Sequence, residues 1–309
     1  MSLVNSKKLF KDALKGNYAI GAFNFVNLEG LNAIINVAEK LQTPVIIQSS
    51  TGALKYAGDK ITREMVYGRC TKSKIPVCWN LDHGKTYEDC KKAVDLGFTN
   101  VMIDASSLPY EENIKLTKKV VTYAHKKNVT VEAELGVLAG IEEEVKADKH
   151  LYTDPDMVVD FITKTGVDSL AIAIGTSHGT HKFKGEATLR FDILKEIEKK
   201  LPNFPLVLHG ASSIPTTLVE KAEQYGAKLT GASGVPEKML QKACKMNICK
   251  VNVDSDLRLA FTTGIRQYLT EHPENVDIRK FLGLGQSLME EQVEHKIKQI
   301  FRTKSIGKK

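Results

Sequence analysis

The chain alternates short β-rich runs with amphipathic stretches of ten or more residues, and this alternation continues almost to its end. Regular strand–helix alternation predicts repeated βα units and a parallel sheet. The expected strands are residues 19–25, 44–49, 76–81, 100–103, 130–134, 169–174, 206–209 and 248–253. Because no Pro- or Gly-rich linker divides these units, we expect one α/β domain, a single (β/α)8 TIM barrel over residues 1–309.

Two segments exceed what such a barrel requires. Residues 136–154 follow the fifth expected strand and are highly polar, which predicts a long mobile active-site loop. Residues 278–301 repeat apolar side chains at helical spacing and predict a C-terminal helical extension, packed on its own barrel in preference to a partner. The turn after the first strand lacks a GxGxxG pattern, so a dinucleotide-binding domain is not expected.

Composition narrows the class of protein. Lys and Arg total 44 against 37 Asp and Glu, a net charge of +7 that suits phosphorylated small molecules at least as well as nucleic acid. The five cysteines form no CxxC pair, and the first residues are too polar for a signal peptide. No stretch approaches the roughly 20 apolar residues that span a bilayer. We therefore expect a cytoplasmic protein with no membrane or nucleic-acid partner.

Three histidines, His83, His178 and His209, end expected strands three, six and seven, and each directly precedes a glycine. Active sites of such barrels lie at the carboxyl ends of the strands. Three imidazoles with one open position are the ligand set of a catalytic zinc ion. A single histidine is more often a hydrogen-bonded core or surface residue, but three at equivalent strand ends favour a metal site.

Several ordered motifs resemble one family. They are LDHG (81–84), VEAELG (131–136), GTSHG (175–179), LHGAS (208–212) and NVDS (252–255), with GAFN (21–24) and PVIIQSS (44–50) before them. Together they resemble the class II, zinc-dependent fructose-bisphosphate aldolases, and tagatose-bisphosphate aldolases share the pattern. The chain departs from the family at Asn80, where a histidine is common, and at Ala139-Gly140, where a glycine pair is common.

The resemblance implies a zinc cofactor held by His83, His178 and His209. It also implies that Asp104 and Glu134 form a second or displaced metal position. The alternative for these two carboxylates is a hydrogen-bonded pair at the barrel mouth.

The resemblance further implies three catalytic residues for reversible cleavage of the C3–C4 bond. Asp82 would exchange the proton of the C4 hydroxyl, and its alternative role is to orient a ligand histidine. Asn252 would donate a hydrogen bond to the charge that develops on the ketone oxygen. Glu142 would exchange the C3 proton of dihydroxyacetone phosphate; its neighbour Glu143 could hold that role, or the acidic run could be a solvated surface.

A bisphosphate needs two anion sites, and the resemblance implies the residues that form them. The expected substrate-binding residues are Asn24, Ser50, Gly179, Lys182, Gly210, Ser212, Asp254, Ser255, Arg258 and Arg279. A monovalent cation, Na⁺ or K⁺, would lie beside one phosphate. Because Arg258 matches a family arginine that reaches the neighbouring subunit, we expect a homodimer or a higher homo-oligomer.

Three other interpretations stay open on the sequence alone. A Schiff-base aldolase could use Lys250, which shares inward parity with Asn252. A zinc hydrolase usually opens with His-x-His on strand one, where this chain has Asn24. An inactive barrel that acts as a binding protein is the non-enzymatic alternative.

Overall fold

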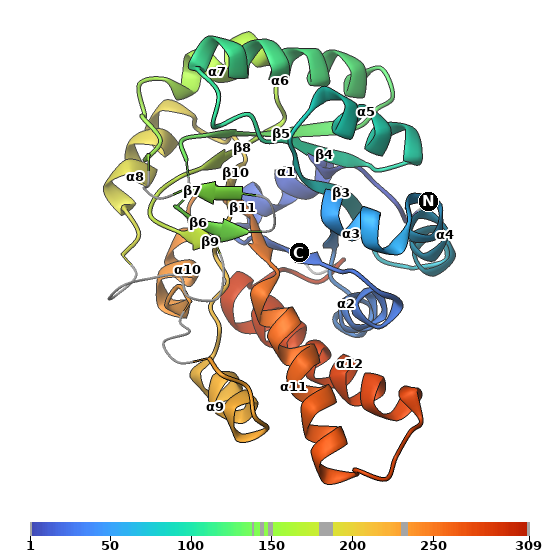
Figure 1. Cartoon of the computed structure of the whole chain (residues 1–309). Coiled ribbons are helices and arrows are strands. Elements are labelled where there is room, and N and C mark those ends of the chain that lie inside the picture. The colour runs from blue at the N-terminus through green and yellow to red at the C-terminus, as the bar shows by residue number, and fades with distance from the viewer. Residues whose placement is uncertain are drawn as a thin grey trace.

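The computed structural model describes residues 2–137, 139–142, 145–147, 151–178, 188–229 and 234–307, with the backbone alone for 139–142, 145–147 and 177–178. In this part of the chain, eight parallel strands close into a barrel, with helices around it (Figure 1). The strands, in the order in which they neighbour one another, are β1 (Ile20–Asn24), β11 (Ile248–Val253), β10 (Leu206–Leu208), β8 (Ser169–Ile172), β5 (Thr130–Leu135), β4 (Asn100–Ile103), β3 (Val77–Gly84) and β2 (Val45–Ser50). The predicted TIM barrel and its eight strands are confirmed.

The helices of the described residues separate successive barrel strands or extend the chain at its ends. They are α1 (Ser6–Gly16), α2 (Leu28–Leu41), α3 (Thr51–Ala57), α4 (Asp59–Cys70), α5 (Tyr87–Leu96), α6 (Tyr110–His125), α7 (Val158–Thr165), α8 (Phe191–Lys200), α9 (Thr216–Gln224), α10 (Glu237–Ala243), α11 (Ser255–Glu271), α12 (Ile278–His295) and a π-helical segment, Lys296–Phe301. None of them is long and apolar enough to cross a membrane.

Alternation along the strands separates the barrel interior from the surface that the helices cover. On β1, Phe23 belongs to the large core shared with helices such as α2, whereas Ile20 and Ala22 belong to a separate interior cluster. Helix α1 adds Leu9 and Phe10 to that interior cluster, and Figure 1 shows α1 behind the ring of strands. The end of the barrel that α1 covers is therefore packed largely with apolar side chains, beside a few buried polar ones such as Ser6, Asn100 and Thr130.

The polar segment after β5 contains a small sheet that the sequence did not predict. Strands β6 (Ala139–Glu142) and β7 (Val145–Ala147) pair antiparallel, and β6 also pairs in parallel with β9 (Ser177–His178). In this pairing Gly140 lies opposite His178. The sheet joins the expected loop to the segment that carries an expected metal ligand. Movement of residues 136–154 stays a prediction.

The C-terminal region packs on its own chain. Helix α12 contacts α11 and α2, and the side of α12 that carries Leu288, Met289 and Val293 is buried. A Cβ on Gly264 of α11 would lie 2.7 Å from the Cα of Gly285 on α12, so the two helices touch through glycine backbone. This close crossing holds the middle of α11 against α12, and α11 begins two residues after β11, the strand that carries Asn252.

A buried ion pair ties the C-terminal π-helical segment to the loop after β10. The Lys296 ammonium contacts the Asp256 carboxylate and donates to the Ser213 hydroxyl over 2.6 Å. Asp256 in turn accepts the backbone N–H groups of Ser213 and Ile214 at 3.3 and 3.0 Å. Because both charges are buried and paired, this contact holds the loop that follows His209 in one position.

Candidate active site

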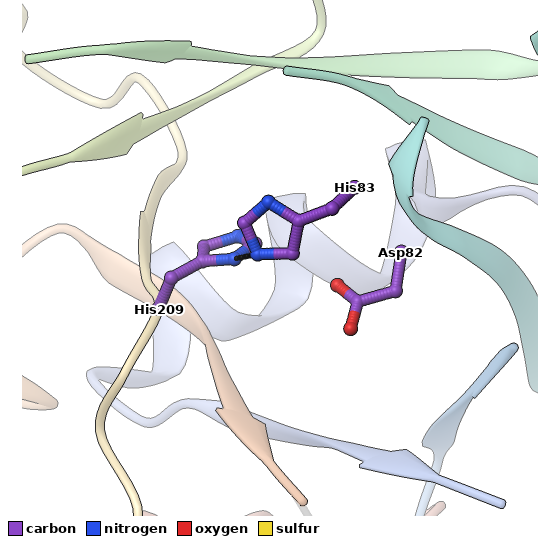
Figure 2. A group of neighbouring side chains, drawn as sticks. All are labelled: Asp82, His83 and His209. Carbon is purple, nitrogen blue, oxygen red and sulfur yellow. Dashed lines mark hydrogen bonds between the residues drawn. The ribbon is translucent and has the colours of Figure 1, made fainter. Parts of the chain in front are cut away.

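The carboxyl end of β3 turns two consecutive side chains toward one space. Neighbouring residues of a strand normally point to opposite faces. His83, however, has a φ of 47°, and the pairing of β3 with β4 shifts between Leu81 and Gly84. This irregularity lets Asp82 and His83 join His209 in one group whose ligand atoms all lie within 4.8 Å of one another. Figure 2 shows the two imidazole rings in contact and the Asp82 carboxylate beside them.

Each of the two histidines points one ring nitrogen at the other histidine and its second ring nitrogen at a carboxylate. His83 Nε2 lies 2.8 Å from His209 Nδ1. On the far sides of the rings, His83 Nδ1 lies 2.9 Å from Asp104, and His209 Nε2 lies 2.7 Å from Glu132. Histidines that bind metals commonly use one nitrogen for the metal and hold a carboxylate with the other. The two facing nitrogens belong to a group of side chains that could hold a cation.

Burial and neighbouring charges set the protonation of this pair. Burial lowers the pKa of His209, and the charge of His83 lowers it further, which favours the neutral ring that binds metals. Burial alone would raise the pKa of Glu132, but Lys250 and His209 outweigh it and bring the pKa to about 2. Lys250 is fully buried and contacts both Glu132 oxygens at 3.0 and 2.8 Å. Glu132 is therefore a carboxylate that His209 and Lys250 share.

A second group of potential ligands comprises His83, Asp104 and Glu134. Although burial opposes ionisation, His83 and Lys85 hold the pKa of Asp104 well below its usual value. The pKa of Glu134 is shifted in the opposite direction, because burial and the Asp104 charge raise it to about 8. One Glu134 oxygen, Oε2, is buried without a hydrogen-bond partner in the described structure. A cation beside Asp104 would satisfy this atom.

We expect Glu134→Gln to change how stability depends on pH in chelator-treated protein. The folded state raises the Glu134 pKa from 4.5 to about 8, so its proton stabilises the fold fully below pH 4.5. That contribution is lost as pH rises through about 8, because the folded state must then bury a charge. Thermal unfolding from acid to alkaline pH should show Glu134→Gln gaining on the wild type as pH rises. A difference independent of pH would contradict the buried protonated Glu134.

Two asparagines hold the Asp82 carboxylate. Asn24, on β1, donates to Asp82 Oδ2 over 2.8 Å, and Asn252, on β11, donates to Oδ1 over 2.9 Å. Asn252 Nδ2 also lies 3.1 Å from His209 Nδ1, so it touches both halves of the site. Asn252 Oδ1 is buried and unpartnered among the described residues. Asp82 therefore has a fixed orientation at the mouth of the barrel.

Several of the expected substrate-binding residues lie at or just beyond the carboxyl ends of β2, β10 and β11. Ser50 ends β2 opposite Asp82, and its hydroxyl accepts the Ala53 N–H as the N-cap of α3. Ser212 is buried in the turn after β10, beyond Gly210, whose φ is 58°.

The end of β11 supplies the remaining described residues of this kind. Ser255 begins α11, and Asp254, just before it, accepts from Arg258 over 2.8 Å. Arg279 is highly exposed and pairs with Asp277 at the start of α12, with no described contact to the Asp82 group.

Five predicted residues lie wholly or partly outside what the structure describes. Glu143, the alternative to Glu142, is outside the described residues, as are Gly179 and Lys182. For His178 and Glu142, only the backbone is described, in β9 and β6. Their roles stay predictions.

Sequence reasoning missed Glu132 and Gln48 as parts of this site. Glu132 shares strand parity with Glu134 in an otherwise apolar run, and a charged residue inside such a run was the available signal. Gln48 similarly interrupts β2 and donates to Asn24 over 2.8 Å. Both lie deeper in the barrel than the strand ends, where active-site residues of such barrels are expected.

Comparison with known proteins assigns the chain to a family. A family model described as fructose-bisphosphate aldolase class-II matches residues 4–306. A fructose-bisphosphate aldolase from Treponema pallidum is 49% identical over 97% of this chain and 96% of that protein. One from Helicobacter pylori is 46% identical over 96% and 97%. The crystal structure of the YdjI aldolase from Escherichia coli K12 superposes with a TM-score of 0.80 and 30% identity, covering 99% of this chain and 98% of that one. The chain belongs to the class II fructose-bisphosphate aldolase family.

Proposed function

We propose that this protein is a fructose-1,6-bisphosphate aldolase, which reversibly cleaves fructose 1,6-bisphosphate to dihydroxyacetone phosphate and glyceraldehyde 3-phosphate in glycolysis and gluconeogenesis. The observation that carries the proposal is the Asp82 carboxylate, held by two asparagines beside the facing nitrogens of His83 and His209. Full-length relatives with that name support the substrate.

We propose zinc as the metal, with His83, His209 and His178 as its ligands. The donor set fits, because the imidazoles of His83 and His209 face one space. The other ring nitrogen of each imidazole contacts a carboxylate, that of Asp104 or Glu132. The unpartnered oxygens of Glu134 and Asn252 supply further polar atoms around that space. When bound, zinc would supply Lewis-acid stabilisation of negative charge on the ketone oxygen of the substrate. Asp104 and Glu134 would offer the second or displaced position.

The residues of the chain divide the proton transfers. In cleavage, Asp82 accepts the C4 hydroxyl proton while the C3–C4 bond breaks and the C4 carbonyl forms; in condensation it returns that proton. Asn24 and Asn252 keep the carboxylate oriented during both directions. We assign to Asn252 the amide donor for the ketone oxygen, which is the role that the family resemblance implies. Glu142 exchanges the C3 proton of dihydroxyacetone phosphate.

We assign phosphate binding to turns at the ends of β2, β10 and β11. Ser212, Ser255 and the backbone at Gly210 would hold one phosphate, with Asp254, Gly179 and Lys182 beside it and a monovalent cation, Na⁺ or K⁺, nearby. Asn24, Ser50, Arg258 and Arg279 would contact the rest of the substrate. Since Arg258 matches an arginine that serves a neighbouring subunit in the family, we also propose a homo-oligomer.

We propose a reducing, cytoplasmic location. The five cysteines are all buried free thiols, and burial raises the pKa of Cys70 and Cys244 to about 12. Such thiols are unreactive and compatible with a compartment that keeps cysteines reduced.

The Schiff-base alternative is disfavoured by the surroundings of Lys250. Its ammonium lies between both oxygens of Glu132 and is fully buried. An ion-paired ammonium has no free electron pair with which to attack a carbonyl. Lys250 instead pairs with the charge of Glu132, the carboxylate that contacts His209.

A coupled cleavage assay tests the proposed function. Purified protein with zinc should release triose phosphate from fructose 1,6-bisphosphate with a higher kcat/KM than from tagatose 1,6-bisphosphate. The two sugars differ at the C4 hydroxyl, which Asp82 must reach. A preference for tagatose would establish the alternative aldolase, release of inorganic phosphate would indicate a hydrolase, and no turnover of either sugar would favour a binding protein.

A further inference from the structure

A row of polar side chains crosses five neighbouring strands inside the barrel. The backbone registers pair Asn24 with Gln48, Gln48 with Asn80, Asn80 with Asn100, and Asn100 with Thr130. Asn24 ends β1, whereas Asn100 and Thr130 begin β4 and β5. The row therefore descends from the active-site end of the barrel to the opposite end. Each of these side chains is at least nine-tenths buried.

Hydrogen bonds join the row into one chain that ends on Asp82. Asn24 donates to Asp82 over 2.8 Å, Gln48 to Asn24 over 2.8 Å, Asn80 to Gln48 over 2.7 Å, and Asn100 to Asn80 over 2.6 Å. Every amide nitrogen thus faces Asp82, and every amide oxygen faces away from it.

The carboxylate itself dictates this direction. Both Asp82 oxygens accept hydrogen bonds from asparagine NH₂ groups, so Asn24 presents its NH₂ group to Asp82. The Asn24 oxygen then faces Gln48, which must donate in turn, and the same requirement passes through Asn80 to Asn100. At the far end, Asn100 accepts from the Thr130 and Ser6 hydroxyls at 2.6 and 3.1 Å. Hydroxyl groups can rotate to donate, so they terminate the chain without an unsatisfied atom.

We propose that this amide chain positions the Asp82 carboxylate for proton transfer, with Asn80 and Asn100 as positioning residues that touch no substrate. The inference rests on the proposed role of Asp82. Asn24 holds Asp82 through one end of its amide, and among the described contacts the other end is held by Gln48, which also donates to the Ala22 carbonyl over 3.5 Å. Loss of a remote link would leave the Gln48 amide oxygen without its donor, so Gln48 could turn and give up its bond to Asn24, and the Asp82 carboxylate would then be held less rigidly. Aligned hydrogen bonds also polarise one another, so a remote break weakens the last bond.

Removing the third link tests the proposal. Asn80→Leu replaces the amide with an apolar side chain of similar size and breaks the chain between Gln48 and Asn100. We expect kcat for fructose 1,6-bisphosphate cleavage to fall roughly 10- to 100-fold, as for other residues that orient a catalytic group, with KM and metal content unchanged. Exchange of the dihydroxyacetone phosphate C3 proton should stay at the wild-type rate, because it does not use Asp82.

A restoring variant and a matched control separate positioning from stability. Asn80→His supplies one donor and one acceptor in its neutral ring, so it should restore kcat. Ser169→Ala alters another fully buried barrel residue, whose hydroxyl has no partner among the described atoms, and should behave as wild type. Thermal unfolding is measured for every variant. If Asn80→Leu does not fold, Asn100→Ala breaks the same chain one link further away and should lower kcat selectively.

Two results would overturn the proposal. One is wild-type kcat in a folded Asn80→Leu or Asn100→Ala variant. The other is an equal fall in cleavage and C3 proton exchange that Asn80→His does not restore, which would mean that the chain only stabilises the barrel. Failure of the proposed function is distinguishable, because the wild-type protein itself would then cleave neither sugar.

Discussion

Asp82→Ala is expected to lower kcat for C3–C4 cleavage by about 10² to 10⁴, the usual contribution of a positioned acid/base group. The variant should keep its metal, because the facing nitrogens of His83 and His209 and the carboxylates behind them are unchanged. It should also keep C3 proton exchange, which we assign to Glu142. Cleavage kinetics, metal analysis and tritium exchange from dihydroxyacetone phosphate measure the three properties on one preparation.

Asp82→Asn serves as the isosteric companion of this variant. It preserves the volume at the barrel mouth, but its NH₂ group must face Asn24 or Asn252, both of which donate to Asp82 in the wild type. We expect the same loss of cleavage. Loss of metal in both variants would instead assign Asp82 to orienting His83, and parallel loss of exchange would show that the two proton transfers are not separate.

His209→Ala is expected to abolish tight metal binding and to lower cleavage by about 10³ or more, since Lewis-acid stabilisation contributes several kcal/mol and each 1.4 kcal/mol is tenfold. The imidazole is buried between His83, Glu132 and Asn252, so no other described side chain replaces its nitrogen. Metal content after dialysis and the cleavage rate at saturating substrate check both effects.

His125→Ala is the matched control for this prediction. His125 also holds a carboxylate, Asp168, over 2.8 Å, but it lies on the exposed side of α6. Its removal should leave metal binding and cleavage unchanged. Full metal content in His209→Ala would contradict the ligand assignment, whatever its activity.

The fold could be predicted because each barrel strand is a short apolar run between amphipathic stretches. The pairing of β6 with β7 and β9 could not, since residues 136–154 carry charges instead of an apolar pattern. The strand ends also located Asp82, His83 and His209. That Asp82 and His83 face one space was hidden, because it depends on the φ of 47° at His83 and a register shift.

Contacts between strands that are distant in the sequence were the part of the site that the sequence predicted least well. Asn252 reaches Asp82 across the barrel interior, from β11 to β3, and only closure of the barrel brings these strands together. Likewise, Gln48, Asn80 and Asn100 are polar residues inside separate strands, and their link appears only when the registers are known. The sequence marks these residues as unusual, because they are polar side chains in otherwise apolar strands, but it does not indicate which of them contact one another.

The central claim, metal-dependent aldol cleavage at the Asp82, His83 and His209 group, is tested most directly by reconstitution. Protein treated with chelator is assayed for fructose 1,6-bisphosphate cleavage while zinc is added back in substoichiometric steps. Activity should be absent without zinc, rise linearly and stop rising at one equivalent per chain. Undiminished cleavage by metal-free protein, lost on borohydride treatment with substrate, would contradict the account and place the chemistry at a lysine.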